Sequence, residues 1–304
     1  MARLHFSGDG DILVCGEVMV GRSGLMIIDT HTHVYPDKIA EKTLELLTGR
    51  AGTAAHTDGT YDGLKRSMEV AGVDVSVVLP VATSAKQYER INENAYRINE
   101  RFGETGIMSF GGIHPENENY KEILNDIKSK GLKGIKLHPD YQDAYMDDIR
   151  YKRIISYATE LDLAVVVHAG QDIGLPDDIH CTVDMLVNVI DEVKPTKFIL
   201  AHLGGWQSWD GVYEKICGRN VYLDTAFAYG QIDYLDGYAH RWKLATTEQF
   251  VKIINKHGAD KILFATDSPW ADQKKSIEDI YGLPVDEDTK KMILGENAKK
   301  LLCV

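Results

Sequence analysis

The chain has 304 residues, of which 44% are hydrophobic and 26% charged, a composition typical of a folded globular protein. Its 34 lysine and arginine residues stand against 46 aspartate and glutamate residues, a formal net charge of -12. This acidic balance argues against a general affinity for nucleic acids or anionic membranes. No apolar run approaches the roughly 20 residues that a membrane span requires, so we expect no membrane partner.

The first 25 residues do not follow the pattern of the rest of the chain. Residues 11–14 and 17–20 can pair as a hairpin across Cys15 and Gly16, and Met26 opens the first regular strand. The N-terminus lacks the features of a secretory signal, and the four cysteines are scattered without a CxxC pair. We therefore expect residues 1–25 to be an extension, residues 26–304 to form one domain, and the protein to be cytoplasmic with reduced thiols.

Short apolar or β-branched runs recur after residue 25 and alternate with segments of helical spacing. Several runs are too apolar for a half-exposed strand and are typical of buried parallel strands. Residues 154–161 and 183–193 each place their apolar side chains on one helical face, and residues 86–102 predict a long polar helix. The eight predicted strands cover residues 26–29, 73–79, 107–113, 132–138, 163–168, 197–202, 220–224 and 261–267.

Eight strands alternating with helices over about 280 residues favour an α/β fold of the (β/α)8 TIM-barrel type. A doubly wound open sheet is the structural alternative. Its dinucleotide-binding form is disfavoured, because no GxGxxG motif follows a predicted strand.

Polar residues end most of the predicted strands, and the carboxyl ends of barrel strands form the active-site face. His31 and His33 end the first strand two residues apart, so they share a face, and both point into the barrel mouth if Ile28 packs outward. Six histidines lie at strand ends, and Asp267 ends the eighth strand. Imidazoles with a carboxylate suit a borderline divalent ion such as zinc. The pattern predicts a metal site made of His31, His33, His168 and Asp267.

Other strand-end residues have a structural interpretation beside a functional one. Lys136 shares a strand face with His138, and a lysine inside a barrel is costly unless it is paired or functional. It can also extend to the mouth or pair with a carboxylate there. His138 fits a structural role as well as a substrate contact, and Trp270 can wall a pocket or pack on the surface. Asp267 has an alternative as a helix N-cap before Pro269.

Taken together, these segments resemble the amidohydrolase superfamily of metal-dependent barrels, especially the branch that includes aminocarboxymuconate semialdehyde decarboxylase. The resemblance rests on IDTHTH at 28–33, VVVHAG at 165–170, ILAHLGG at 199–205 and LFATDSPW at 263–270. They occur in the family's order, across essentially all of residues 26–304. The resemblance implies a metal-dependent barrel in which the first, fifth and eighth strands supply the ligands His31, His33, His168 and Asp267.

The resemblance also implies roles for the remaining strand ends. Asp267 would shuttle protons as well as bind metal, and His202 would contact substrate in a one-metal site or bind a second metal in a two-metal site. The KLHP segment at 136–139 is similar to the fourth-strand segment of dihydroorotases, whose lysine is carboxylated and bridges two metals. We expect one or two Zn2+ or Mn2+ ions per chain. The candidate catalytic residues are Asp267, His202 and Lys136, and the candidate substrate contacts are His138 and Trp270.

Two reactions fit such a centre, and hydrolysis is our main hypothesis. Metal-activated water would attack a small amide, ester or lactone while Asp267 moves the proton. The alternative is non-oxidative decarboxylation of a small carboxylic acid, for which Lys136 would supply a cationic contact.

Two lesser alternatives complete the set. TatD-like nucleases are also similar, through the HxH pair and the TDSPW segment, but they carry a glutamate where this chain has Lys136. The acidic balance also fits a nucleic-acid substrate poorly. A non-catalytic binding barrel is disfavoured by the intact ligand set. We therefore expect a small-molecule substrate and, from base rates alone, a homodimer.

Overall fold

The computed structural model describes residues 24–238 and 240–304. The hairpin predicted within residues 11–20 lies outside these residues. In the described part of the chain no helix is long and apolar enough to cross a membrane. The strands in this part are β1 (Ile28–Thr32), β2 (Val75–Val78), β3 (Ile107–Ser109), β4 (Gly111–Gly112), β5 (Gly134–Leu137), β6 (Ala164–Val167), β7 (Phe198–Leu200), β8 (Tyr222–Asp224) and β9 (Ile262–Leu263).

Parallel pairing joins the strands in the orders β1-β2-β3 and β4-β5-β6-β7-β8-β9. Strands β3 and β4 are halves of one predicted strand, interrupted at Phe110, whose N–H donates to the Val78 carbonyl at 3.0 Å. At the other seam, the Thr30 N–H donates to the Phe264 carbonyl at 3.0 Å, and Thr32 bridges Ser268 in parallel. Sequential parallel strands that close at both seams confirm the predicted (β/α)8 barrel.

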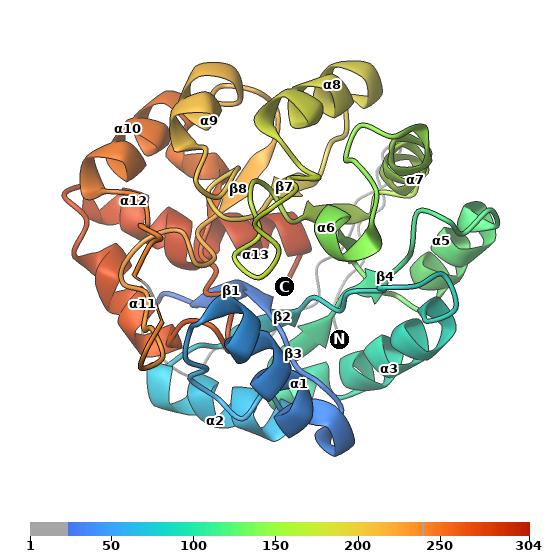
Figure 1. Ribbon diagram of the computed structural model, residues 1–304, viewed down its shortest axis with the longest axis horizontal. Helices are drawn as coiled ribbons and strands as arrows, with labels where there is room; N and C mark the ends of the chain where they lie inside the picture. The colour runs from blue at the N-terminus through green and yellow to red at the C-terminus, as the bar shows by residue number, and fades with distance from the viewer. Residues whose placement is uncertain (1–23, 239) are drawn as a thin grey trace, which may run out of the picture.

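Helices surround the strands, and α6 lies inside the ring of helices in the view of Figure 1. Helix α6 comes directly after β5 and His138. The helices predicted within 86–102, 154–161 and 183–193 correspond to α3, α7 and α8. The helices are α1 (Asp37–Ala51), α2 (Tyr61–Ala71), α3 (Tyr88–Glu100), α4 (Phe102–Thr105), α5 (Tyr120–Ser129), α6 (Pro139–Gln142), α7 (Ile149–Glu160), α8 (Val183–Val193), α9 (Trp209–Lys215), α10 (Thr247–His257), α11 (Gln273–Tyr281), α12 (Glu287–Lys291) and α13 (Asn297–Leu302), with a 3-10 helix η1 (Ala259–Lys261) and a π-helix η2 (Met292–Glu296).

Capping side chains and a glycine fix the ends of several helices. The Thr182 hydroxyl accepts from the Met185 N–H at the start of α8, and Thr246 forms a capping box with Gln249 at the start of α10. Helix α2 ends at Gly72, whose left-handed backbone favours glycine. These signals position the helices, and their buried apolar faces hold them against the barrel.

The core has an outer layer between strands and helices and an inner cluster inside the barrel. Val77, Val166 and Ile199 from three different strands meet in the inner cluster, which α13 closes through Leu301. Ile28 also belongs to this cluster, so the condition under which simple alternation would point both imidazoles into the mouth, outward packing of Ile28, is not met. A register irregularity between Asp29 and Thr32, a span that contains His31, interrupts the alternation of side chains.

Gly170, which follows β6, supports a prediction about how the loops at the mouth pack. Its backbone has φ +89°, and a Cβ there would lie 2.2 Å from the Trp206 nitrogen and 2.6 Å from the Gly205 carbonyl carbon. We expect Gly170→Ala to lower the free energy of unfolding by about 2–5 kcal/mol, because left-handed strain and a backbone clash add together. Urea unfolding followed by circular dichroism measures the change.

Gly131→Ala is the matched control, since Gly131 has φ +73° and open space around its Cβ position. It should cost only about 1–2 kcal/mol, from left-handed strain alone. Equal costs for the two variants would contradict the proposed clash.

Candidate metal centre

The seam between β1 and the segment after β9 is fixed by a buried carboxylate. Asp29 accepts from the His31 N–H at 3.2 Å, from the Thr266 hydroxyl at 2.6 Å and from the Gln273 amide at 2.8 Å. Burial raises the pKa of Asp29 to about 6, although these hydrogen bonds act in the opposite direction. The Asp267 N–H donates to the His31 carbonyl at 2.8 Å and holds Asp267 in a left-handed conformation with φ +67°.

Three acceptor atoms face one another at this seam. His33 Nε2 lies 3.1 Å and His31 Nε2 3.5 Å from Asp267 Oδ1. The other nitrogen of each ring is already committed, because His31 Nδ1 donates to Asp224 at 2.9 Å and His33 Nδ1 to the Leu79 carbonyl at 2.9 Å. Burial, followed by the nearby Lys136 charge, lowers the pKa of His31 well below its ordinary value. In a neutral ring Nε2 therefore carries a lone pair that points toward Asp267.

This donor set fits a divalent cation. Lone pairs and a carboxylate oxygen at these separations repel one another unless a positive charge lies between them. Four ligands about 2.0–2.1 Å from a zinc ion form a tetrahedron with edges of about 3.3 Å, close to the two distances above. Two imidazoles and a carboxylate suit zinc or manganese, and His31, His33 and Asp267 form one of the groups that could hold an ion.

The structure places the fourth predicted ligand, His168, in a different group. Its Nδ1 lies 2.9 Å from His202 Nε2, whose ring donates through Nδ1 to the Ala226 carbonyl at 2.8 Å. His168 groups with His138 and Asp172, with their ligand atoms within 4.8 Å of one another. The His31 and His202 rings nevertheless lie 5.4 Å apart, so the two groups share one mouth.

Lys136 lies between these groups and is 1% exposed. Its Nζ is 3.0 Å from His31 Nε2, and an ammonium there donates to the ring's lone pair. Burial lowers the pKa of Lys136 to about 8, although the nearby Asp224 and Asp267 carboxylates act against the shift.

The two predicted substrate contacts differ in their surroundings. His138 is buried, stacks on His168 at 4.2 Å between ring centroids and meets Tyr141 edge-on at 4.6 Å. Trp270 is partly buried against the outer core, and its backbone N–H donates to the Asp267 carbonyl at 2.9 Å. No helix begins at Pro269, because α11 begins at Gln273 with Asp272 as its cap, so Asp267 is not an N-cap.

The sequence patterns did not predict two polar residues that lie at the mouth of the barrel. Asp224 ends β8 and orients both His31, through Oδ2, and the backbone of His202, through Oδ1. Its position at the end of the predicted strand 220–224 was an available signal. Arg50, near the end of α1, lies near the Tyr141 phenol, where its charge acts against the rise in the phenol's pKa that burial causes. No pattern marked Arg50, because an arginine at the end of a polar helix is usually solvated.

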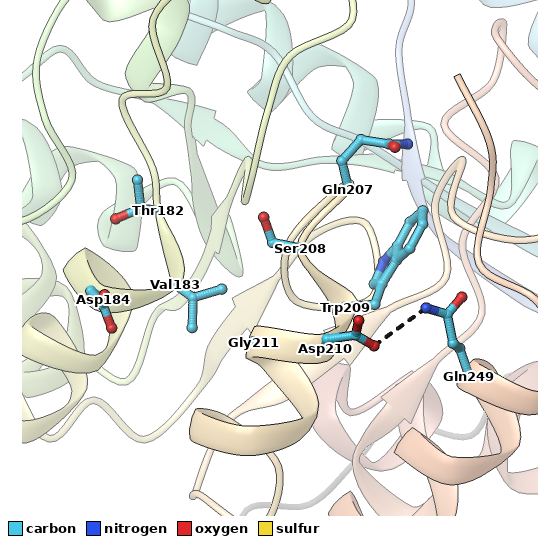
Figure 2. Close-up of a pocket in the computed structure, with 9 residues that line it drawn as sticks. All are labelled: Thr182, Val183, Asp184, Gln207, Ser208, Trp209, Asp210, Gly211 and Gln249. Carbon is cyan, nitrogen blue, oxygen red and sulfur yellow. Dashed lines mark hydrogen bonds between the residues drawn. The ribbon is translucent and has the colours of Figure 1, made fainter. Parts of the chain in front are cut away.

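A cavity of about 420 Å³ lies apart from these groups, where the amino-terminal ends of α8, α9 and α10 meet (Figure 2). None of the predicted site residues lines it. Trp209 forms part of its wall, and the indole N–H donates to the His202 carbonyl at 3.1 Å. The cavity lining comprises Thr182, Val183, Asp184, Gln207, Ser208, Trp209, Asp210, Gly211 and Gln249.

The fold and these groups define a (β/α)8 barrel with a candidate metal centre at the carboxyl ends of its strands. Residues 28–303 match the family described as amidohydrolase. The chain therefore belongs to the amidohydrolase family, an enzyme family, as its motifs predicted. A comparison with curated protein sequences gives no match.

Solved structures show the same fold at low sequence identity. The 5-carboxyvanillate decarboxylase of Sphingomonas paucimobilis superposes with a TM-score of 0.64 at 14% identity, covering 92% of this chain and 100% of the other. The 2,6-dihydroxybenzoate decarboxylase from Rhizobium gives 0.65 at 14% identity, covering 92% and 99%. A dihydroxybenzoic acid decarboxylase from Polaromonas sp. JS666, with bound manganese and 2-nitroresorcinol, gives 0.63 at 18% identity, covering 92% and 97%.

The contact between Asp224 and His31 generates a prediction about metal affinity. Asp224→Asn removes the charged acceptor that sets the His31 tautomer, so we expect metal to bind about 10–100-fold more weakly. Competition with a fluorescent chelator measures the affinity. Asp126→Asn, at an exposed carboxylate that contacts none of these groups, should leave it unchanged. An Asp224→Asn affinity equal to that of the parent would contradict this orienting role.

Proposed function

We propose that the protein is a metal-dependent, non-oxidative decarboxylase of a small carboxylic acid. The observation that carries the proposal is a cationic amine at the metal centre, since Lys136 Nζ lies 3.0 Å from the candidate ligand His31 and is almost fully buried. A buried cation beside a metal site is suited to an anionic substrate. The fold shared with several decarboxylases supports this choice over hydrolysis.

A second cation strengthens the argument for a carboxylate substrate. Arg50 is exposed on α1 and makes no ion pair with any residue of the described ranges. Its charge acts on the pKa of the nearby Tyr141 phenol, and the Tyr141 ring contacts His138. The Arg50 guanidinium is therefore free to meet an anionic group that approaches the mouth.

In the proposed reaction, His31, His33 and Asp267 would hold the ion, with His168 as the fourth predicted ligand. A bound Zn2+ or Mn2+ supplies Lewis-acid polarisation of substrate oxygens. Lys136 binds the substrate carboxylate as an ammonium and orients the bond that breaks. Asp267 accepts a proton from a substrate hydroxyl and returns it to the carbon that loses CO2. His202, held by the Ala226 carbonyl through Nδ1, presents a neutral Nε2 to the substrate.

Hydrolysis of an amide, ester or lactone is the second candidate, and one observation favours it. Lys136 occupies the position that the dihydroorotase resemblance assigns to a carboxylated, metal-bridging lysine, and its lowered pKa increases the fraction of free amine that can react with CO2. In that case His168 and His202 would bind a second ion. Release of CO2 without uptake of solvent oxygen supports decarboxylation, whereas incorporation of oxygen from labelled water into product supports hydrolysis.

Lys136→Met tests the proposed carboxylate contact. Manganese-loaded enzyme is assayed for CO2 release from 2,6-dihydroxybenzoate, 5-carboxyvanillate and related hydroxylated acids. We expect the variant to lose at least about 100-fold in kcat/KM, because a charge-assisted contact in a water-poor site is worth about 3 kcal/mol. Methionine keeps the length of the side chain and removes its charge.

Lys133→Met is the control from the opposite end of the same barrel strand, where Lys133 donates to the Leu302 carbonyl at 2.6 Å. It should leave kcat/KM unchanged even if it lowers the melting temperature. Failure of the parent enzyme to release CO2 from any acid in the panel, together with turnover of lactones or esters, would replace the decarboxylase proposal with hydrolysis.

A further inference from the structure

The side chain of Thr266 bridges the backbone on both sides of the candidate metal ligand Asp267. The Thr266 hydroxyl accepts from the Ser268 N–H at 3.0 Å. The same hydroxyl donates to Asp29 Oδ2 at 2.6 Å, and Asp29 Oδ1 accepts from the Thr266 N–H at 3.0 Å. A single buried hydroxyl therefore closes a tight turn around Asp267 and joins that turn to β1.

The bridge extends through a buried glutamine. Gln273, the first residue of α11, donates from Nε2 to Asp29 Oδ2 at 2.8 Å and to the Ser76 hydroxyl of β2 at 3.2 Å. The hydrogen bonds therefore run from two neighbouring strands, through Gln273 and Asp29, to the Thr266 hydroxyl. All four of these side chains belong to residues that are at most 1% exposed. None of them is accessible to a substrate.

This polar cluster is a costly way to build a purely structural contact. Gln273 Oε1 and Ser268 Oγ are buried without a hydrogen-bond partner among the described residues. A buried polar atom without a partner lowers stability, whereas apolar side chains of similar shape carry no such cost. A buried cluster that is incompletely satisfied therefore calls for an explanation other than stability.

The backbone of Asp267 needs support of this kind. Asp267 has φ +67°, a left-handed conformation that is unfavourable for a non-glycine residue and persists only where the surrounding contacts hold it. The Asp267 N–H donates to the His31 carbonyl at 2.8 Å, and the His33 N–H donates to the Ser268 carbonyl at 2.6 Å. The Thr266 hydroxyl adds a side-chain contact to these backbone bonds. In this conformation Asp267 Oδ1 lies 3.1 Å from His33 Nε2.

We propose that Thr266 and Gln273 are positioning residues for metal binding. The Thr266 hydroxyl, oriented by Asp29 and Gln273, holds Asp267 in the left-handed conformation that directs its carboxylate at the ion. Without the hydroxyl, the Asp267 peptide relaxes toward ordinary backbone angles, its carboxylate moves away from the two imidazoles, and metal binding has to restore the geometry. The inference rests on the metal centre of the proposed function but not on the reaction carried out there.

Metal affinity tests this role without a substrate. Protein stripped by chelator is titrated with MnCl2, and free Mn2+ is followed by electron paramagnetic resonance. We expect Thr266→Val to bind Mn2+ about 10–100-fold more weakly than the parent, because valine has the shape of threonine without the hydroxyl. Thr266→Ser returns the hydroxyl and should restore most of the affinity. Gln273→Met should weaken binding by a smaller factor, since Asp29 keeps its contact with Thr266.

Thr105→Val is the matched control. The Thr105 hydroxyl also accepts from the N–H two residues further on, that of Ile107, at 3.2 Å, and it donates to the Arg101 carbonyl at 2.9 Å. Thr105 is buried too, but it lies just before β3, at the amino-terminal end of the barrel strands. Both valine variants should lower the melting temperature, whereas only Thr266→Val should weaken Mn2+ binding.

Two results would overturn the proposal. One is the affinity of the parent in a folded Thr266→Val variant, which would make the contact structural only. The other is an equal loss of affinity in Thr266→Val and Thr105→Val, which would assign the loss to general destabilisation. If Thr266→Val does not fold, a folded Gln273→Met variant with the affinity of the parent would contradict the proposal instead. A parent that binds Mn2+ but releases no CO2 contradicts only the decarboxylase proposal, so the two failures are distinguishable.

Discussion

Closure of the barrel between β1 and β9 is the constraint on which the candidate site depends. The Thr30 N–H to the Phe264 carbonyl and the Asp267 N–H to the His31 carbonyl join the first and last strands. The buried Asp29 carboxylate then ties the Thr266 hydroxyl to the same seam. His31 and Asp267 come from opposite ends of the chain, so their side chains meet only because these bonds form. The left-handed backbone of Asp267 is held by the same contacts.

Buried carboxylates gather with histidines at the mouth of the barrel. Asp224, Asp267, Asp140 and Asp172 all approach histidines there, and Lys136 is the buried cation among them. Uncompensated buried carboxylates are costly for stability, so such a site is stable only when protons or cations neutralise it. A bound divalent ion would supply part of this neutralisation. Stability and metal binding are then coupled, as expected when a ligand binds only the folded state.

Much of the fold could be read from the order of apolar runs. Buried parallel strands are apolar on both faces, so each leaves a strong local signal, and all eight predicted strands correspond to strand positions in the barrel. The details of register could not be read in this way. The break at Phe110 and the irregularity between Asp29 and Thr32 depend on how neighbouring strands pair. Ile28 packs in the inner cluster ahead of that irregularity, and alternation along one strand could not reveal this.

The sequence by itself determined which strands end in polar residues and which family the chain belongs to, because both follow from local patterns and their order. The sequence did not determine which of those polar residues lie together in one group of possible metal ligands and which lie in another. Only the tertiary structure separates His168 from His31, His33 and Asp267 and places it with His138 and Asp172. Only the structure brings Asp224 to His31 and Arg50 to Tyr141. The physical reason is that a side chain's direction at the end of a strand is set by strand register and by loops from distant segments.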